Sequence, residues 1–224
     1  MAEAYRRTRP PYTRAAVEHA ARRLGLGGDA AVLDLGAGTG KLTDALRERF
    51  AHVVAVEPDE GMRAAGDGTA LAGTAEAIPL ADDAVDAAFA GEAYHWFDHD
   101  RALPELARVT RAGGGLAVLS RSWGEPEQPG LLPRPFSDEL DRIWARFHTG
   151  REFRDWTAGF EGPDRFEETV RISGRDLVDL HLTGSTPASI PAAERQEIAG
   201  RAYPLMAEAY DLRVVTSVYW RLLP

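Results

Sequence analysis

The segment Ala31-Val-Leu-Asp-Leu-Gly-Ala-Gly-Thr-Gly40 joins a short apolar run to three closely spaced glycines. The apolar run consists of Val32, Leu33 and Leu35, and it is typical of a parallel strand that is buried on both faces. The next ten residues, 41–50, place their apolar side chains on one face of a helix. The sequence therefore predicts a strand, a glycine turn and a helix in succession.

The spacing of Gly36, Gly38 and Gly40 indicates what the turn binds. Glycines let backbone amides approach a ligand without obstruction by a Cβ atom, and a following helix favours anionic groups. Enzymes that bind nicotinamide dinucleotides use G-x-G-x-x-G, whereas this turn reads G-x-G-x-G and follows Asp34. A carboxylate at position 34 attracts an ammonium group and repels a pyrophosphate. An unliganded turn is the alternative for three glycines alone.

Composition limits the class of protein. The 224 residues are enough for one well-buried α/β domain with an insertion. A net charge of −9 argues against a nucleic-acid partner, and the absence of cysteine excludes disulfides and zinc–thiolate sites. The N-terminus lacks an apolar signal core, and no apolar run approaches the roughly 20 residues that span a bilayer. We therefore expect a cytoplasmic protein with no nucleic-acid or membrane partner.

Residues 1–12 contain arginines, the tyrosines Tyr5 and Tyr12, and two adjacent prolines, which predict an irregular arm. Arginines between tyrosines can bind an acidic group, although the composition alone favours a solvated arm. Thr13 can then cap a helix that runs to Leu24.

A second buried strand, rich in valine, ends at Glu57, and Met62 follows on a short helix. In dinucleotide-binding folds an acid at the tip of this strand accepts hydrogen bonds from ribose hydroxyls. A glutamate that simply faces solvent is the alternative. We therefore expect Glu57 to bind the ribose of a nucleoside-bearing cofactor.

After a short strand over 70–72, a third clear strand over 87–90 is followed by Gly91-Glu-Ala-Tyr-His-Trp-Phe-Asp98. Ligands in open α/β sheets lie beyond the carboxyl ends of the strands, so this cluster should face the pocket. His95 is the polar candidate for contact with substrate, and a hydrogen-bonded structural histidine is the alternative. His95, Asp98 and His99 also have a spacing that can bind metal. Asp98 as the N-cap of the next helix is simpler, so no metal is predicted.

The chain continues as helix and strand, which completes a βαβα order and a parallel sheet with helices on both faces. Residues 123–162 are unusually rich in aromatic side chains, so we expect an insertion that covers the active site. Within it, Ile143, Trp144 and Phe147 are expected to share one face of a helix. A helix pair with its own small core, or the contact of a homodimer, are the alternatives. After it we predict two strands and two helices over 166–172, 174–182, 192–209 and 213–220.

Four stretches resemble one family, the class I S-adenosylmethionine (SAM) methyltransferases. Asp34 and the three glycines match its motif I, D-x-G-x-G-x-G. Residues 73–80 resemble G-D-A-E-x-L-P-F, with Thr74 in place of Asp. Residues 91–98 resemble the Q-A-x-H-W-F/V-D signature of a subgroup that includes trans-aconitate-methyltransferase-like proteins, with Glu92 in place of Gln. Residues 5–12 resemble the segment before the core, Y-x-x-x-R-P-x-Y.

The resemblance implies a single Rossmann-like domain over 1–224, with a seven-stranded, mostly parallel sheet in the order 3-2-1-4-5-7-6 and the aromatic-rich insertion after the fifth strand. It implies SAM as the cofactor and a small molecule as the acceptor. The residues expected to bind the cofactor are Tyr5, Asp34, Gly36, Gly38, Gly40, Glu57, Met62, Ala75, Glu76 and Gly91. Those expected to bind substrate are Tyr12, Tyr94, His95, Trp96 and Trp123, with His95 also the candidate catalytic residue.

The chemistry that the resemblance implies needs little from the protein besides alignment. Methyl transfer from a sulfonium is an in-line displacement, and a base is needed only if the acceptor must lose a proton. We expect methyl transfer, with O-methylation favoured. A SAM-fold protein that binds the cofactor without methylating is the alternative, and the glycine spacing disfavours a nicotinamide-dependent oxidoreductase.

Overall fold

A computed structural model describes residues 2–124, 128–147, 156–184 and 189–224. The chain divides into two compact units, and each is described by itself. The larger unit comprises Pro11–Arg121, Asp155–Phe166 and Thr216–Pro224, and the smaller comprises Met1–Pro10, Ser122–Arg154 and Glu167–Val215. The predicted insertion over 123–162 contributes to both units, and its residues 125–127 and 148–155 lie outside the described part of the chain.

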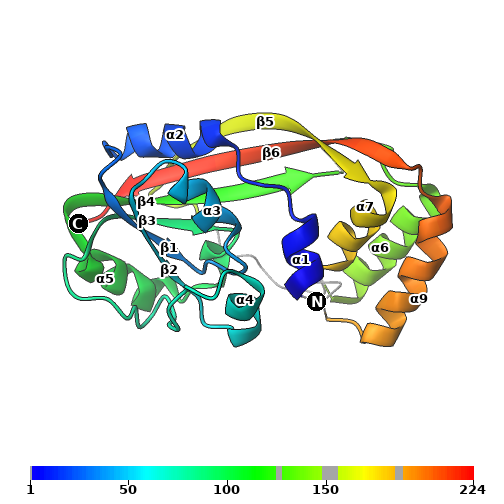
Figure 1. Ribbon diagram of the computed structural model, residues 1–224, viewed down its shortest axis with the longest axis horizontal. Coiled ribbons are helices and arrows are strands. Elements are labelled where there is room, and N and C mark those ends of the chain that lie inside the picture. Colours follow the sequence, from blue (N-terminus) through cyan, green and yellow to red (C-terminus); the bar gives the residue numbers. More distant parts are fainter. Residues whose placement is uncertain (1, 125–127, 148–155, 185–188) are drawn as a thin grey trace. The chain divides into compact units, whose positions relative to one another are not determined.

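Six strands form one sheet in the order β2-β1-β3-β4-β6-β5 (Figure 1). β1 pairs in parallel with both β2 and β3, and β3 pairs in parallel with β4. The end of β6 lies beside the start of β4, because the N–H of Leu223 donates to the carbonyl of Gly114 at 3.0 Å, and Figure 1 shows these strands running in opposite directions. The bounds are β1 Ala31–Leu35, β2 His52–Val56, β3 Val85–Gly91, β4 Thr110–Trp123, β5 Glu161–Ser173 and β6 Ala209–Leu222.

The resemblance implies seven strands in the order 3-2-1-4-5-7-6, and the structure confirms the Rossmann-like α/β fold, with one strand fewer among the described residues. The missing strand is the edge strand expected at 70–72, where a single bridge joins Val56 to Leu71. Leu71 is 41 % exposed, so little apolar burial stabilises a longer strand there. The order of the other six strands follows the prediction.

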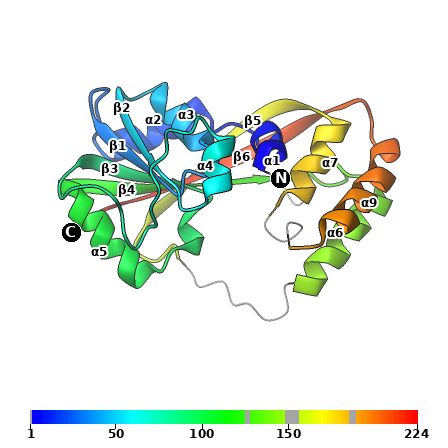
Figure 2. The same ribbon diagram turned by 60° about the horizontal axis from the view of Figure 1, so that its bottom comes forward.

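Helices cover both faces of the sheet in the larger unit (Figure 2). Alternate strand residues such as Phe89 pack against α2 (Arg14–Arg23) and α3 (Lys41–Arg47), and their neighbours such as Ala88 pack against α5 (His99–Val109). This division follows from the two-residue period of a strand, which sends successive side chains to opposite faces.

Both predicted helix caps lie at the N-cap position, but only one of them makes a capping hydrogen bond. The Thr13 hydroxyl accepts the N–H of Ala16 at 3.0 Å and caps α2 as predicted. Asp98 occupies the N-cap position of α5, but its side chain makes no capping hydrogen bond. β4 begins at Thr110 and includes the glycines at 113–115, where its register with β3 shifts between Thr110 and Gly115.

The smaller unit gathers three helices, α6 (Arg134–Phe147), α7 (Gly174–Leu182) and α9 (Ala192–Ala202), around its own apolar core. The 3-10 turn η2 (Tyr203–Leu205) follows α9. The predicted helix over 192–209 is therefore too long, since a proline at position 204 cannot extend the hydrogen-bond ladder of a regular helix.

The N-terminal residues form a helix, α1 (Ala2–Thr8), where the sequence analysis expects an irregular arm. The expectation is wrong because both prolines lie beyond the helix, at positions 10 and 11, and restrict only the backbone around them. The N–H of Arg9 still donates to the carbonyl of Tyr5 at 3.0 Å, so the helical hydrogen bonds continue up to the first proline.

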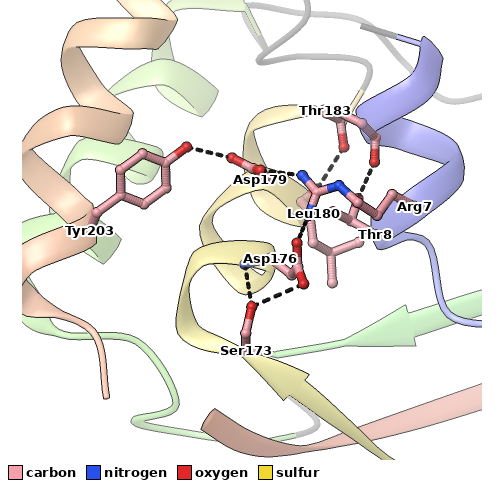
Figure 3. Close-up of polar contacts among 9 residues, drawn as sticks. Arg7, Thr8, Ser173, Asp176, Asp179, Leu180, Thr183 and Tyr203 are labelled. Carbon is pink, nitrogen blue, oxygen red and sulfur yellow. Dashed lines mark hydrogen bonds and ion pairs between the residues drawn. The ribbon is translucent and has the colours of Figure 1, made fainter. Parts of the chain in front are cut away.

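Polar contacts hold α1 against α7 (Figure 3). The guanidinium of Arg7 pairs with Asp179 at 2.6 Å and also with Asp176. Asp179 in turn accepts the hydroxyl proton of Tyr203 at 2.7 Å. The side chain of Arg7 is half exposed, so each ion pair contributes less than about 1 kcal/mol by itself.

Helix α6 buries a different face from the one expected. The sequence analysis assigns Ile143 and Trp144 to the same face, but Phe136, Leu140 and Ile143 are buried, whereas Trp144 is 46 % exposed. Adjacent residues lie about 100° apart around a helix, so the face that includes Ile143 excludes Trp144. In the described part of the chain no helix is long and apolar enough to cross a membrane.

Candidate functional site

The glycine loop between β1 and α3 has a backbone that other residues rarely adopt. The φ angles of Gly36, Gly38 and Gly40 are 73°, 58° and 84°, in the left-handed region that favours glycine. The N–H of Gly36 donates to the carbonyl of Val56 at 2.9 Å, which ties the loop to the end of β2. A Cβ at Gly38 would meet no atom within 4 Å, so this part of the loop faces open space.

Glu57 lies at the tip of β2 and is held by the loop. Its side chain is buried, with 7 % of the residue exposed. One carboxylate oxygen accepts the N–H of Gly38 at 2.8 Å, and the other accepts the N–H of Asp59 at 2.9 Å. A carboxylate has about four acceptor positions, so each oxygen can still accept another hydrogen bond. The carboxylate is thus oriented in advance and keeps acceptor capacity for two neighbouring hydroxyl groups.

Asp34 lies at the end of β1 and is fully buried beneath the loop. Its Oδ2 accepts the hydroxyl proton of Thr43 at 2.5 Å, while Oδ1 has no hydrogen-bond partner. Burial raises the pKa of Asp34 to about 7, although the hydrogen bonds from Thr43 oppose the shift, and the charge of Glu57 adds to it. Near neutral pH this carboxyl group is therefore divided between its two protonation states.

Ala75 and Glu76, which the resemblance assigns to the adenine ring, follow the bridge at 70–72. Ala75 is buried, and a carboxylate oxygen of Glu76 accepts the N–H of Asp98 at 2.9 Å. Burial alone would raise the pKa of Glu76, but hydrogen bonds from Asp98 and Thr74 outweigh it and lower the pKa overall. Thr74, which replaces the Asp of the resembled motif, therefore helps to hold Glu76 charged. Met62 is partly exposed on α4 (Glu60–Ala65).

The tips of β3 and β4 are joined around Tyr12. A Cβ at Gly91 would lie 2.4 Å from the Tyr12 hydroxyl, so only glycine allows the tyrosine to pack there. The guanidinium of Arg121 lies 3.9 Å from the centre of the Tyr12 ring. Glu92 adopts a left-handed φ of 54°, and its carboxylate accepts the N–H of Arg121. Such a backbone is strained for a residue with a side chain.

The three aromatic residues of the turn η1 (Tyr94–Trp96) point in different directions. Tyr94 is 2 % exposed, stacks on His99 at 4.5 Å between ring centres, and meets Phe160 edge-on. His95 and Trp96 are exposed, with their ring centres 5.0 Å apart. The partial burial of the imidazole lowers the pKa of His95, and the carboxylate of a nearby glutamate, Glu92, opposes this. His95 is therefore mainly neutral at pH 7 and able to accept a proton.

The other two predicted site residues lie in the smaller unit. The guanidinium of Arg9 lies 4.5 Å from the ring centre of Tyr5 and 5.0 Å from that of Trp123. The structure therefore brings Gly36, Gly38, Gly40, Asp34 and Glu57 together in the larger unit. The roles of Tyr5 with the cofactor and of Trp123 with the substrate stay predictions.

Sequence reasoning missed several groups that complete these sites. Thr43, which donates to Asp34, has no sequence signal beyond its place in the helix after the loop. Arg9 carried a partial signal as one of the arginines between Tyr5 and Tyr12, and Arg121 as a charged residue just after an apolar run that predicts a strand. Within the described ranges, no three histidine, aspartate or glutamate side chains are grouped so that they could hold a metal ion.

A parallel sheet with helices on both faces, a glycine turn after the first strand and an acid at the tip of the second define a Rossmann-like protein. Comparison with known proteins identifies the particular family. Residues 33–118 match the family described as a methyltransferase domain. With the relatives below, this shows that the chain belongs to the class I SAM-dependent methyltransferases.

Relatives and solved structures agree with this assignment. Uncharacterized methyltransferases of Mycobacterium bovis and Mycobacterium tuberculosis are 51 % identical over 218 residues, covering 91 % of this chain and 83 % of theirs. A malonyl-[acyl-carrier protein] O-methyltransferase of Methylococcus capsulatus is 44 % identical over 99 residues, 39 % of this chain and 36 % of the relative. A structure from Anaeromyxobacter dehalogenans, assigned to the type II methyltransferases, has a TM-score of 0.68 and 26 % identity, covering 96 % of this chain and 98 % of that one. The resemblance to the trans-aconitate subgroup stays a prediction.

Proposed function

We propose that this protein transfers the methyl group of SAM to a small-molecule acceptor, with oxygen as the methylated atom. The observation that supports this proposal most directly is the buried carboxylate of Glu57, which accepts hydrogen bonds from the backbone amides of Gly38 and Asp59. Its remaining acceptor positions suit the two vicinal hydroxyls of a ribose.

The residues around the loop fit this cofactor. Glu57 would accept the ribose hydroxyls, and the open space at Gly38 leaves room for close approach to the loop backbone. Asp34 offers a buried acceptor, Oδ1, that has no partner and would favour the ammonium group at the amino-acid end. Ala75 and Glu76 would bind the adenine edge. The bound cofactor would supply a methyl group activated by a positively charged sulfur.

The protein's part in the reaction is to hold the acceptor in line and to manage one proton. Alignment supplies much of the acceleration, because the leaving group is good. His95 is exposed beyond the tip of β3 and neutral at pH 7, so its imidazole can take the proton of a hydroxyl acceptor. With a carboxylate acceptor no proton leaves, and His95 would only orient the acceptor.

The relative from Methylococcus capsulatus, which its name describes as an O-methyltransferase, supports oxygen as the methylated atom. The matched part of that relative is about a third of its length, so the support extends to the kind of transfer and not to the acceptor.

Two measurements test the proposal. Calorimetric titration should show binding of SAM and of S-adenosylhomocysteine, and no binding of NAD. Incubation with methyl-labelled SAM and a panel of small hydroxy and carboxylic acids should then transfer label to an oxygen. Binding of SAM without transfer to any acceptor would favour a protein that uses the fold without methylating.

A further inference from the structure

The side chain of Arg63 reaches from α4 back to the tip of β2. Its Nη1 atom donates to the backbone carbonyl of Glu57 at 2.8 Å and to that of Pro58 at 2.7 Å. Arg63 is half-buried and lines the same small cavity as Gly38 of the glycine loop. One guanidinium group therefore holds the backbone of the residue whose carboxylate is bonded to that loop.

The carboxylate of Glu57 lies between two amides that belong to different segments. One oxygen accepts the N–H of Gly38 in the loop at 2.8 Å, and the other accepts the N–H of Asp59, just before α4, at 2.9 Å. Hydrogen bonds of this kind have lengths of about 2.7–3.2 Å and weaken steeply as they bend. A small rotation of the Glu57 backbone would therefore break one of the two bonds and turn the carboxylate away from its present direction.

Helix α4 begins without help from the Arg63 side chain. The carboxylate of Asp59 accepts the N–H of Met62 at 2.7 Å and caps the helix, and the carbonyl of Asp59 accepts the N–H of Arg63 at 3.0 Å. Both bonds use backbone or Asp59 atoms, which a change of the side chain at position 63 leaves in place. The groups that lose a donor when the guanidinium is removed are the carbonyls of Glu57 and Pro58.

We propose that Arg63 is a positioning residue for the ribose of the cofactor. It fixes the backbone of Glu57, and thereby the direction of the carboxylate that accepts the ribose hydroxyls. An arginine suits this task, because its guanidinium is planar, carries several N–H donors and is always charged. The inference rests on the proposed function, since it takes Glu57 as the residue that binds the ribose.

The test compares S-adenosylhomocysteine with its 2′-deoxy analogue by calorimetric titration. The two ligands differ in one ribose hydroxyl, so the ratio of their affinities measures the contact with Glu57. In wild type S-adenosylhomocysteine should bind roughly tenfold or more tightly, as expected for one hydrogen bond to a charged group. Arg63→Met should lower this ratio below about threefold, because a displaced carboxylate accepts the hydroxyl at a poor angle.

A purely structural role for Arg63 predicts a different result. General damage to the loop or to α4 weakens both ligands by the same factor and keeps the wild-type ratio. An unchanged ratio in a folded Arg63→Met protein would therefore overturn the proposal. Arg63→Lys keeps the charge without the planar group, so its ratio should lie between those of wild type and Arg63→Met. If melting curves show that Arg63→Met fails to fold, Arg63→Lys replaces it, and a wild-type ratio in that variant would contradict the proposal.

Arg49→Met is the matched control. Arg49 is also half-buried in the larger unit, and its guanidinium donates to the backbone carbonyl of Leu26 at 3.1 Å. The substitution therefore removes the same kind of hydrogen bond at a carbonyl that does not belong to the tip of β2. The affinity ratio should stay at its wild-type value. A ratio that falls equally in Arg49→Met and Arg63→Met would refute a specific role for Arg63.

A second measurement needs no cofactor. The amide of Gly38 donates to the Glu57 carboxylate, so the NMR chemical shift of its proton depends on where the carboxylate lies. This resonance should move in Arg63→Met and stay in place in Arg49→Met. If S-adenosylhomocysteine binds and the resonance stays in place in Arg63→Met, the positioning role is wrong and the proposed function stands. If the resonance moves but wild type does not bind S-adenosylhomocysteine, the proposed function is wrong, and the ribose as the ligand of Glu57 fails with it.

Discussion

Asp34→Asn should change how the stability of the protein depends on pH. The substitution keeps the size of the side chain and an oxygen that accepts the Thr43 hydroxyl, and it removes the titrating proton. Burial raises the pKa of Asp34 from 3.8 to about 7 in the folded protein. The folded protein therefore binds the proton of Asp34 more tightly than the unfolded chain does. This contribution to the free energy of unfolding is fully present below pH 3.8 and is lost as the pH rises through 7.

The expected magnitude follows from the size of the shift. Each pKa unit corresponds to about 1.4 kcal/mol, so a shift of about 3 units corresponds to roughly 4 kcal/mol. The free energy of unfolding of wild type, relative to Asp34→Asn, should decrease by up to this amount between pH 4 and 7. At pH 7 and above the variant should be the more stable protein, because it no longer buries a charge.

Urea unfolding followed by circular dichroism, at half-unit steps from pH 4.5 to 8, measures this difference. Using the difference between the two proteins cancels the titration of all other groups. Asp44→Asn is the matched control, since it makes the same chemical change at an exposed position of α3. If the free energies of unfolding of wild type and Asp34→Asn run parallel over this pH range, the carboxyl group is already ionised in the folded protein, and burial does not raise its pKa.

Three further substitutions test the site. Glu57→Ala should weaken SAM by roughly tenfold or more in a calorimetric titration, because it removes a charge-assisted hydrogen bond worth about 1.5–3 kcal/mol; a loss below about twofold would remove Glu57 from the site. Gly38→Val should abolish SAM binding, because the new side chain enters the open space beside the loop and a φ of 58° strains a β-branched residue there. The far-ultraviolet spectrum should stay intact, since no atom lies within 4 Å of an added Cβ; unchanged affinity would refute the loop assignment. His95→Ala should lower kcat by about 10²–10⁴-fold with a hydroxyl acceptor and keep SAM affinity within about twofold. The wild-type kcat should fall at acidic pH with a midpoint below 6.5, because partial burial lowers the pKa of His95; a midpoint above 6.5 would contradict that role.

The parts of the fold that sequence predicts well are those set by nearby residues. The strand, turn and helix around Gly38 are confirmed, because left-handed glycines and an apolar run act within a few residues of one another. The acid at the tip of β2 is recognisable for the same reason, since Glu57 follows directly after the strand.

The parts that sequence does not predict depend on residues far apart in the chain. Whether Trp144 or Leu140 of α6 faces the core of the smaller unit depends on α7 and α9, which pack against α6 and follow it by about thirty residues or more. Arg7 and Asp179 are 172 positions apart, so neither indicates the other in the sequence. The unexpected helix α1 has a local explanation, because the prolines that suggested an arm lie after it.

The alternation of the two units along the chain limits how this protein could have been assembled. Each unit consists of three separate segments, so the backbone passes from one to the other five times. No single stretch of gene encodes either unit, and none could be exchanged between proteins by one recombination event. An exchange of the smaller unit between relatives would therefore need three separate replacements, one for each of its segments.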